Sequence, residues 1–209
     1  MVELTAADIR QIAPRADELI RLLDAERQSR VRALGASDEA LRSLAAGLLL
    51  HDAFGEAASR GRFVRGEHGK PRLPDGRPFN LSHAGDYAVL ALSDEPVGMD
   101  IERIRPLDAE RFAARFFHPL ERRFTAASAD RSAAVFLIWT LKESYLKAEG
   151  QGLSVSPASF CILPNKDGSA SLADGPQYRF RSFDAFPGYC LSVCSREREI
   201  ASDIRMRSW

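Results

Sequence analysis

The chain has 209 residues, of which 45% are hydrophobic and 28% are charged, a balance typical of a folded protein with its own core. Its 29 basic residues equal its 29 acidic residues, so the formal net charge is zero, which argues against bulk nucleic-acid binding. No run reaches the roughly 18 apolar residues of a membrane span, and we expect no signal segment because residues 1–11 are polar and have no apolar core. We expect the three cysteines to be buried on strands rather than to hold zinc or form a disulfide framework, as in a cytoplasmic protein: Cys161, Cys190 and Cys194.

Two similar passes of helix followed by strands run along the sequence. The first pass is expected to contain a helix from Asp24 to Gly35, a helix from Ser37 to Gly55, and a hairpin with arms at 79–83 and 87–92 around a turn at 84–86. The second is expected to contain a strand at 97–104, helices at 108–117 and just after Pro119, a long helix at 131–149, and strands at 159–163, 177–183 and 189–193. We therefore predict an α+β fold of two α+β halves, residues 1–95 and 96–209.

The segment 97–102 places two carboxylates on one side of an expected strand. Side chains alternate along a strand, so its three apolar residues would face a core while Gly98, Asp100 and Glu102 would face the other way. Two carboxylates beside a glycine that leaves room for a ligand suit a hard divalent cation. The alternative is a half-exposed strand with a polar outer face, because a single Asp-x-Glu is weak evidence.

The long helix adds a third carboxylate. Four of its residues lie along one stripe at helical spacing: Phe136, Trp139, Glu143 and Lys147. The aromatic residues mark the stripe as inward-facing, so both charges are expected to enter a packed or cleft environment, where an unpaired charge is costly. An ordinary i, i+4 Glu–Lys pair, worth about 0.3–0.5 kcal/mol, is the alternative. That pair would explain the charges but not the aromatic stripe, whereas a metal carboxylate followed by a phosphate-binding lysine explains both.

Further polar residues lie in the expected hairpin and in the loop before it. Asn80 and Ser82 share one strand face, and His83 lies where the chain enters the turn. A serine before the histidine and a glycine turn after it make a reasonable place for a phosphate, although a structural histidine is the alternative. Lys70, in the sequence Gly-Lys-Pro at 69–71, is by itself only a lysine in a turn.

Basic residues recur in two of the expected helices. Arg27 and Arg30 are about one helical turn apart and share a face, either as part of a site or as a solvated basic surface. The segment 111–123 is rich in arginine and phenylalanine, so it is either a docking face for an acidic partner or an ordinary amphipathic helix.

Four short blocks occur together and in order. They are Gly-Lys-Pro at 69–71, Phe-Asn-Leu-Ser-His at 79–83, Val-Gly-Met-Asp-Ile-Glu at 97–102, and Trp-Thr-Leu-Lys-Glu-Ser-Tyr-Leu-Lys at 139–147. The set resembles the surfactin-synthetase-activating (Sfp-like) type of 4'-phosphopantetheinyl transferase, from about Asp24 to about Ser159. The segment Phe116–Glu121 resembles a further block of that family, which carries a site glutamate.

The resemblance implies a pseudo-dimeric fold with coenzyme A bound in the cleft between two similar α+β halves. It implies magnesium ligands at Asp100, Glu102 and Glu143. Contacts to the phosphates of coenzyme A are implied at Lys70, Ser82, His83 and Lys147, and basic residues near its adenosine 3'-phosphate at Arg27, Arg30 and Arg42. A monomer is expected, because the two halves already supply the cleft.

The activity implied by the resemblance is magnesium-dependent transfer of 4'-phosphopantetheine from coenzyme A to a serine of an acyl or peptidyl carrier protein. Lys147 would neutralise the developing charge. Glu143, or a water that it orients, would take the serine proton, with Glu121 as the second candidate. The rival functions are a magnesium-dependent nucleotide pyrophosphohydrolase and a non-catalytic module that binds coenzyme A or a carrier protein.

Overall fold

The computed structural model describes residues 1–66, 69–150, 152–173, 175 and 177–209. Its helices are α1 (Ile9–Ile12), α2 (Ala16–Leu19), α3 (Ala25–Ala33), α4 (Asp38–Phe54), α5 (Glu56–Ser59), α6 (Ala109–Phe116), α7 (Pro119–Ala127) and α8 (Arg131–Glu149), with short 3-10 turns at 13–15, 20–22, 152–154 and 157–159. Its strands are β1 (Glu3–Asp8), β2 (Val64–Arg65), β3 (Pro71–Arg72), β4 (Phe79–Ala84), β5 (Tyr87–Leu92), β6 (Val97–Arg103), β7 (Ile162–Pro164), β8 (Ser169–Leu172), β9 (Arg179–Phe183), β10 (Tyr189–Ser195) and β11 (Arg205–Arg207). The α+β class is confirmed.

The capping residues read from the sequence begin and end the long helices. The Asp24 side chain accepts a hydrogen bond from the Arg27 amide at the start of α3, and Ser37 does the same for Ala40 in α4. Gly150 ends α8 in the left-handed region, with φ of 73°, where a residue without Cβ is favoured.

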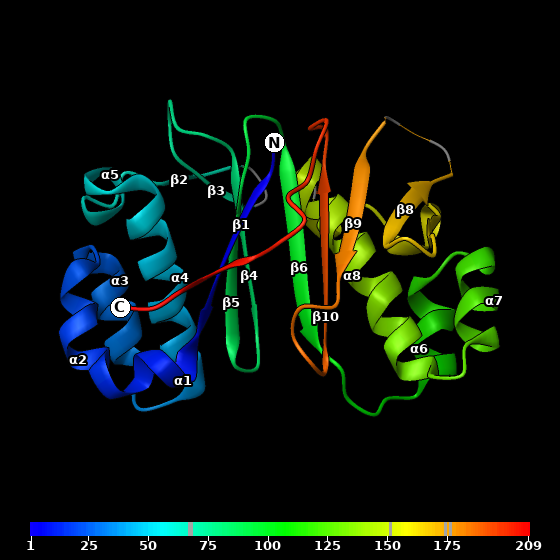
Figure 1. The fold of residues 1–209 in the computed structure, drawn as a ribbon, viewed down its shortest axis with the longest axis horizontal. Coiled ribbons are helices and arrows are strands. Elements are labelled where there is room, and N and C mark those ends of the chain that lie inside the picture. Colours follow the sequence, from blue (N-terminus) through cyan, green and yellow to red (C-terminus); the bar gives the residue numbers. More distant parts are fainter. Residues whose placement is uncertain (67–68, 151, 174, 176) are drawn as a thin grey trace.

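Two larger sheets stand side by side in the middle of the molecule, with the N-terminal helices on one side and the C-terminal helices on the other (Figure 1). One sheet has the strand order β11-β1-β5-β4, and the other has the order β6-β10-β9-β8-β7. Helix α4 packs on the first sheet, and α8 packs on β6 and β10 of the second. A continuous apolar core joins the inner faces of the two sheets, including Leu4, Val89, Met99 and Leu191.

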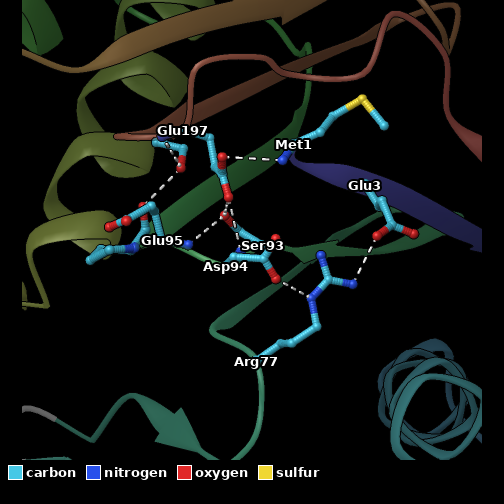
Figure 2. A network of polar contacts seen from close by, with 9 residues as sticks. Met1, Glu3, Arg77, Ser93, Asp94, Glu95 and Glu197 are labelled. Atoms are coloured by element: carbon cyan, nitrogen blue, oxygen red, sulfur yellow. Dashed lines mark hydrogen bonds and ion pairs between the residues drawn. The ribbon is translucent and has the colours of Figure 1, made fainter.

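The connection from β5 to β6 belongs to a network of polar contacts with the N-terminus and with the segment that follows β10. The Glu197 carboxylate accepts a hydrogen bond from the Asp94 amide at 3.1 Å and pairs with the N-terminal amino group of Met1 at 3.1 Å (Figure 2). Arg77 bridges Glu3 and Asp94 in the same network. The boundary at residues 95 and 96 therefore lies within a network of long-range contacts, and the division into separate domains there stays a prediction.

The C-terminal tail crosses back to the first sheet. Strand β11 pairs in parallel with β1, so residues 205–207 belong to the sheet of the N-terminal half. Arg207 pairs with Asp52 of α4 at 2.6 Å, and the Trp209 indole donates to Asp52 at 3.2 Å. None of the helices in the described parts of the chain has both the length and the apolar character needed to cross a bilayer.

Candidate active site

Strand β6 sends its apolar and polar side chains to opposite faces, as the alternation predicts. Val97, Met99 and Ile101 are buried in the core between the sheets, and Asp100 lies on the face toward α8. The prediction that Gly98 leaves room for a ligand is wrong. A Cβ at Gly98 would overlap the backbone of α8 at Ser144 and Ala148, so the glycine permits a close approach of helix and strand.

Asp100 is the meeting point of three elements. Its carboxylate is buried, and Oδ1 accepts hydrogen bonds from Ser82 Oγ of β4 at 2.9 Å and from Lys147 Nζ of α8 at 2.6 Å. Its second oxygen, Oδ2, is buried without a hydrogen-bond partner among the described residues. Leaving a buried carboxylate oxygen unsatisfied is costly, and this oxygen is available to accept a hydrogen bond or to coordinate a cation.

Two further carboxylates interact electrostatically with Asp100. Burial raises the pKa of Glu102, and the charge of Asp100 raises it further. Burial also raises the pKa of Glu143, with the charges of Asp100 and Glu102 adding to the effect and the charge of Lys147 opposing it. Glu102 also pairs with Arg105 at 3.7 Å. The structure therefore brings the three predicted metal carboxylates into one electrostatic cluster.

The cluster fits magnesium in its chemistry, although it is not a closed cage. In the described parts of the chain, no three His, Cys, Asp or Glu side chains converge as a ready-made metal site. Magnesium commonly keeps several waters and takes one or two carboxylates together with substrate phosphates, so a closed protein cage is not required. The unpartnered Oδ2 of Asp100, close to two other acidic groups, is the observation that fits such an ion.

Strand β4 uses side chains to satisfy the backbone of β6. The Asn80 Oδ1 accepts the Met99 amide at 2.8 Å, and Ser82 Oγ accepts the Ile101 amide at 3.3 Å. Ser82 therefore fixes the β6 backbone and donates to Asp100 at the same time. Its place beside Lys147 Nζ, at 3.3 Å, puts the predicted phosphate contacts Ser82 and Lys147 together.

A cleft of about 430 Å³ opens beside this cluster. The β4–β5 turn and the end of β6 line it, with α4 completing the wall: Glu39, Arg42, His83, Ala84, Gly85, Glu102, Arg103 and Arg105. Partial desolvation in the cleft lowers the pKa of His83, and the charges of Arg42 and Lys147 lower it further. A larger hollow of about 550 Å³, among α2, α3, α4 and the 3-10 turns beside α2, contains none of the predicted site residues.

The three arginines expected near one phosphate lie in two places. Arg27 and Arg30 line a small hollow of about 90 Å³ together with Arg65 and Pro71. Burial lowers the pKa of Arg27, and the charges of Arg30 and Arg65 lower it further, whereas those of Asp24 and Glu26, which line the same hollow, oppose the shift. Arg42 instead lines the cleft, where its guanidinium donates to the Gly85 carbonyl at 3.0 Å.

Lys70 points into the protein rather than into the cleft. Its ammonium donates to the backbone carbonyls of Val97 at 2.8 Å and Lys147 at 2.6 Å, which ties the loop to β6 and α8. Burial lowers the pKa of Lys70 to about 8. In this structure Lys70 therefore orients the backbone of two site elements, and its contact with a phosphate stays a prediction.

Glu121 does not lie in the cleft, so its predicted role as a second proton acceptor is wrong. The side chain is fully buried and pairs with the equally buried Lys142 at 2.8 Å. Its oxygens also accept the amides of His118 at 2.8 Å and Ile162 at 2.7 Å. The bond from the His118 amide caps α7, and the contacts with Lys142 and Ile162 hold α7 against α8 and β7, so Glu121 supports the helix that carries Glu143 and Lys147.

The segment 111–123 covers most of α6 and the first half of α7. Its phenylalanines pack inward, since Phe112 and Phe116 both contact the Trp139 ring edge-on, at 5.3 Å between ring centroids. Arg122 donates to the carbonyls of Ala114 and Phe117. These contacts are those of the amphipathic-helix alternative, and docking of a partner on this segment stays a prediction.

Two residues that contribute to the site could not be identified from any pattern in the sequence. Arg65 ends the two-residue strand β2, and only the fold brings it to Arg27 and Arg30. Tyr189, on β10, reaches the β4–β5 turn with a hydroxyl that accepts the Asp86 amide at 3.0 Å, across 103 residues of sequence. A pattern of local spacing could not have found either contact.

Comparison with known proteins adds sequence relatives to this geometry. The family model described as the 4'-phosphopantetheinyl transferase superfamily matches residues 96–194. The chain is 30% identical over 205 residues to the 4'-phosphopantetheinyl transferase Sfp of Bacillus subtilis strain 168, with 92% of this chain and 91% of that protein covered. Another 4'-phosphopantetheinyl transferase of Bacillus subtilis is 32% identical over 204 residues, with the same shares covered.

Other similarities are partial. The chain is 46% identical over 93 residues to the 4'-phosphopantetheinyl transferase AcpT of Salmonella typhi, with 42% of this chain and 48% of AcpT covered. The crystal structure of the holo-[acyl-carrier-protein] synthase of Thermotoga maritima overlaps with a TM-score of 0.43 at 21% identity, covering 50% of this chain and 64% of that chain. The matches along nearly the whole sequence are therefore the ones that bear on the family of this protein.

Proposed function

This chain belongs to the 4'-phosphopantetheinyl transferase superfamily, and from that premise we propose its substrates, its metal and the roles of the residues around the cleft. The enzyme transfers 4'-phosphopantetheine from coenzyme A to a serine hydroxyl of an apo acyl or peptidyl carrier protein. Adenosine 3',5'-bisphosphate is the second product. The observation that carries this proposal is the buried Asp100 carboxylate, which has one oxygen held by Ser82 and Lys147 and the other unpartnered.

Asp100, Glu102 and Glu143 are the residues that would hold magnesium. When bound, magnesium supplies positive charge that neutralises and aligns the pyrophosphate oxygens. The family name implies a reaction at phosphorus, and clustered carboxylates beside a lysine supply what such a reaction needs.

Lys147 and Ser82 hold the phosphoryl group on the other side of Asp100. The carrier serine oxygen forms a bond to the β-phosphorus of coenzyme A, and the bond from that phosphorus to the bridging oxygen breaks, so the electron pair leaves with adenosine 3',5'-bisphosphate. The Lys147 ammonium compensates the negative charge that develops on these oxygens, because it lies half-buried where screening by water is reduced.

Glu143 accepts the proton of the carrier serine. Burial raises the pKa of Glu143, but the magnesium that Glu143 would hold opposes that shift, so the place of Glu143 in the carboxylate cluster, and not its pKa, supports this role. With Glu121 sequestered in its buried pair with Lys142, Glu143 is the acceptor that the arrangement favours.

The remaining cations bind the nucleotide end of coenzyme A. Arg27, Arg30 and Arg65 line the hollow that we assign to the 3'-phosphate, where they outnumber the two acidic residues Asp24 and Glu26, and Arg42 and His83 line the cleft beside Glu102. The enzyme works as a monomer, because one chain supplies both walls of the cleft.

The test combines the purified protein with coenzyme A, magnesium and an apo carrier protein, and measures the intact mass of the carrier. The expected result is a gain of one phosphopantetheine that requires the metal and the carrier serine. Phosphopantetheine released free in solution would instead indicate a pyrophosphohydrolase. Binding of coenzyme A without transfer to any carrier class would indicate a non-catalytic module.

A further inference from the structure

The turn between β4 and β5 forms one wall of the cleft and is held from both sides. Its residues Ala84 and Gly85 line the cleft directly after His83. From α4, Arg42 donates to the Gly85 carbonyl at 3.0 Å. From β10 in the other sheet, the Tyr189 hydroxyl accepts the Asp86 amide at 3.0 Å. The position of this wall therefore depends on a contact between the two sheets.

Only glycine fits at position 85, where the turn packs against the Tyr189 hydroxyl. Its φ of 49° lies in the left-handed region that favours glycine. A Cβ at this position would overlap the Tyr189 hydroxyl, so no other residue fits while the tyrosine stays in place. The Tyr189 ring is buried and meets the Tyr87 ring edge-on at 5.1 Å, which fixes the direction of its hydroxyl.

The tyrosine sits on the strand next to the proposed metal carboxylates. Strand β10 pairs with β6 so that Tyr189 is opposite Arg103, Cys190 opposite Glu102 and Ser192 opposite Asp100. A hydrogen-bonded strand pair is rigid, so the Tyr189 hydroxyl lies at a fixed distance from the carboxylate cluster. The turn that follows His83 is thereby held at a fixed position relative to β6, the strand that carries Asp100.

We propose that Tyr189 is a positioning residue for coenzyme A, and that its hydroxyl sets the spacing between the His83 side of the cleft and the carboxylates of β6. This inference rests on the proposed function, because the ligand whose fit depends on that spacing is coenzyme A. The hydroxyl makes no contact with the reacting groups. It acts through the backbone of the turn, at Gly85 and Asp86.

The test is Tyr189→Phe, which keeps the ring packing and removes the oxygen that accepts the Asp86 amide. Losing one such hydrogen bond is worth about 1 kcal/mol, so the affinity for coenzyme A can fall by at most roughly fivefold, to the extent that the bound state relies on the bond more than the free protein does. We expect the calorimetric Kd and the KM for coenzyme A to rise by about two- to fivefold, with kcat and the KM for the carrier changed less than about twofold. Faster amide exchange in peptides that contain residues 84–87 would locate the change in the turn.

Tyr178→Phe is the matched control. It also removes a hydroxyl bonded to another element, here the Glu149 carboxylate, but it leaves the turn untouched. Gly85→Ala gives a second line of evidence. It should weaken binding of coenzyme A, and by less in the Tyr189→Phe background than in the wild type, because the overlapping hydroxyl is then gone.

The outcomes distinguish a failure of the proposed function from a failure of the role of Tyr189. A wild-type protein that does not bind coenzyme A would overturn the proposed function and this inference with it. Wild-type binding with an unchanged Kd in Tyr189→Phe, or an equal loss in Tyr178→Phe, would overturn only the role of Tyr189. A fall in kcat without a change in the KM for coenzyme A would also contradict it.

Discussion

Lys147 Nζ lies 2.6 Å from Asp100 Oδ1, while Oδ2 of the same carboxylate is buried without a partner among the described residues. The Asp100 carboxylate therefore has one oxygen paired with Lys147 and one buried oxygen without a partner. A purely structural ion pair would satisfy both oxygens, because an orphaned buried acceptor costs about 1–3 kcal/mol. The arrangement is understandable if the second oxygen serves a ligand that arrives with the reaction.

Asp100→Asn tests that relationship with almost no change in volume. The amide oxygen can still accept from Lys147, but the charge that attracts a divalent cation is lost. We expect kcat/KM for the carrier to fall by about 100-fold or more, by analogy with the loss of one well-placed electrostatic group. Magnesium titrations should show a weaker half-saturation point. Asp167→Asn, in the exposed turn before β8, is the control, and near-normal turnover of Asp100→Asn would contradict the assignment.

Lys142 and Lys147 both lie on α8, and we expect their replacement by methionine to have different effects. Lys142→Met should mainly lower stability, and Lys147→Met should mainly lower activity. Lys142 is fully buried against Glu121, and removing one partner of such a pair costs about 3–5 kcal/mol. Lys147 is partly exposed and Asp100 keeps its hydrogen bond from Ser82, so Lys147→Met should lower the unfolding free energy by about 1–3 kcal/mol, less than Lys142→Met, and lower kcat/KM by about 100-fold. Urea unfolding and initial rates measure the two effects.

The double variant Lys142→Met with Glu121→Leu controls for the uncompensated charge. Replacing both partners by apolar groups should recover much of the stability lost in Lys142→Met. A Glu121→Gln protein that unfolds like the wild type but has lost its activity would return Glu121 to the catalytic residues.

Much of the fold was readable because its signals are local. The caps at Asp24, Ser37 and Asp130 and the left-handed Gly150 each act within a few residues, so the helices begin and end where expected. The alternation along 97–102 correctly placed Asp100 opposite the core residues. The shared stripe of Glu143 and Lys147 on α8 likewise reached the cluster around Asp100.

The parts that were missed depend on pairing across long distances. Strands β1, β8 and β11 are short or weakly patterned, and β11 exists only because the tail returns to β1, some 200 residues earlier in the chain. Glu121 was assigned to the site through the resemblance of residues 116–121, and no local pattern shows that it pairs in the core with Lys142, the neighbour of Glu143 in sequence. The role of Gly98 could not be known before α8 was placed against it.

Arg65→Ala tests the cationic hollow. Arg65 lines it with Arg27 and Arg30, and its charge contributes to the lowered pKa of Arg27. We expect the KM for coenzyme A to rise about three- to tenfold, as one charge-assisted hydrogen bond predicts, and the KM for dephospho-coenzyme A, which lacks the 3'-phosphate, to stay unchanged. The exposed Arg62 is the matched control, and an equal effect on both nucleotides would contradict the placement of the 3'-phosphate.

Lys70 should make the stability of the protein depend on alkaline pH. Burial lowers the pKa of Lys70 from 10.5 to about 8. Between these values the unfolded chain binds more protons than the folded protein, so this group makes the unfolding free energy rise with pH from about 8 to 10.5. The rise is at most about 1.4 kcal/mol per pH unit, and less because the ammonium retains some contact with water.

Lys70→Met isolates that effect. The variant loses the hydrogen bonds to the carbonyls of Val97 and Lys147 at every pH, so it should be less stable throughout. The gap between wild type and variant should widen between pH 7.5 and pH 9.5, because only the wild type gains stability as Lys70 loses its proton. Urea unfolding at the two pH values measures the gap. A gap of equal size at both would show that Lys70 titrates at its ordinary pKa and that its burial is not maintained in solution.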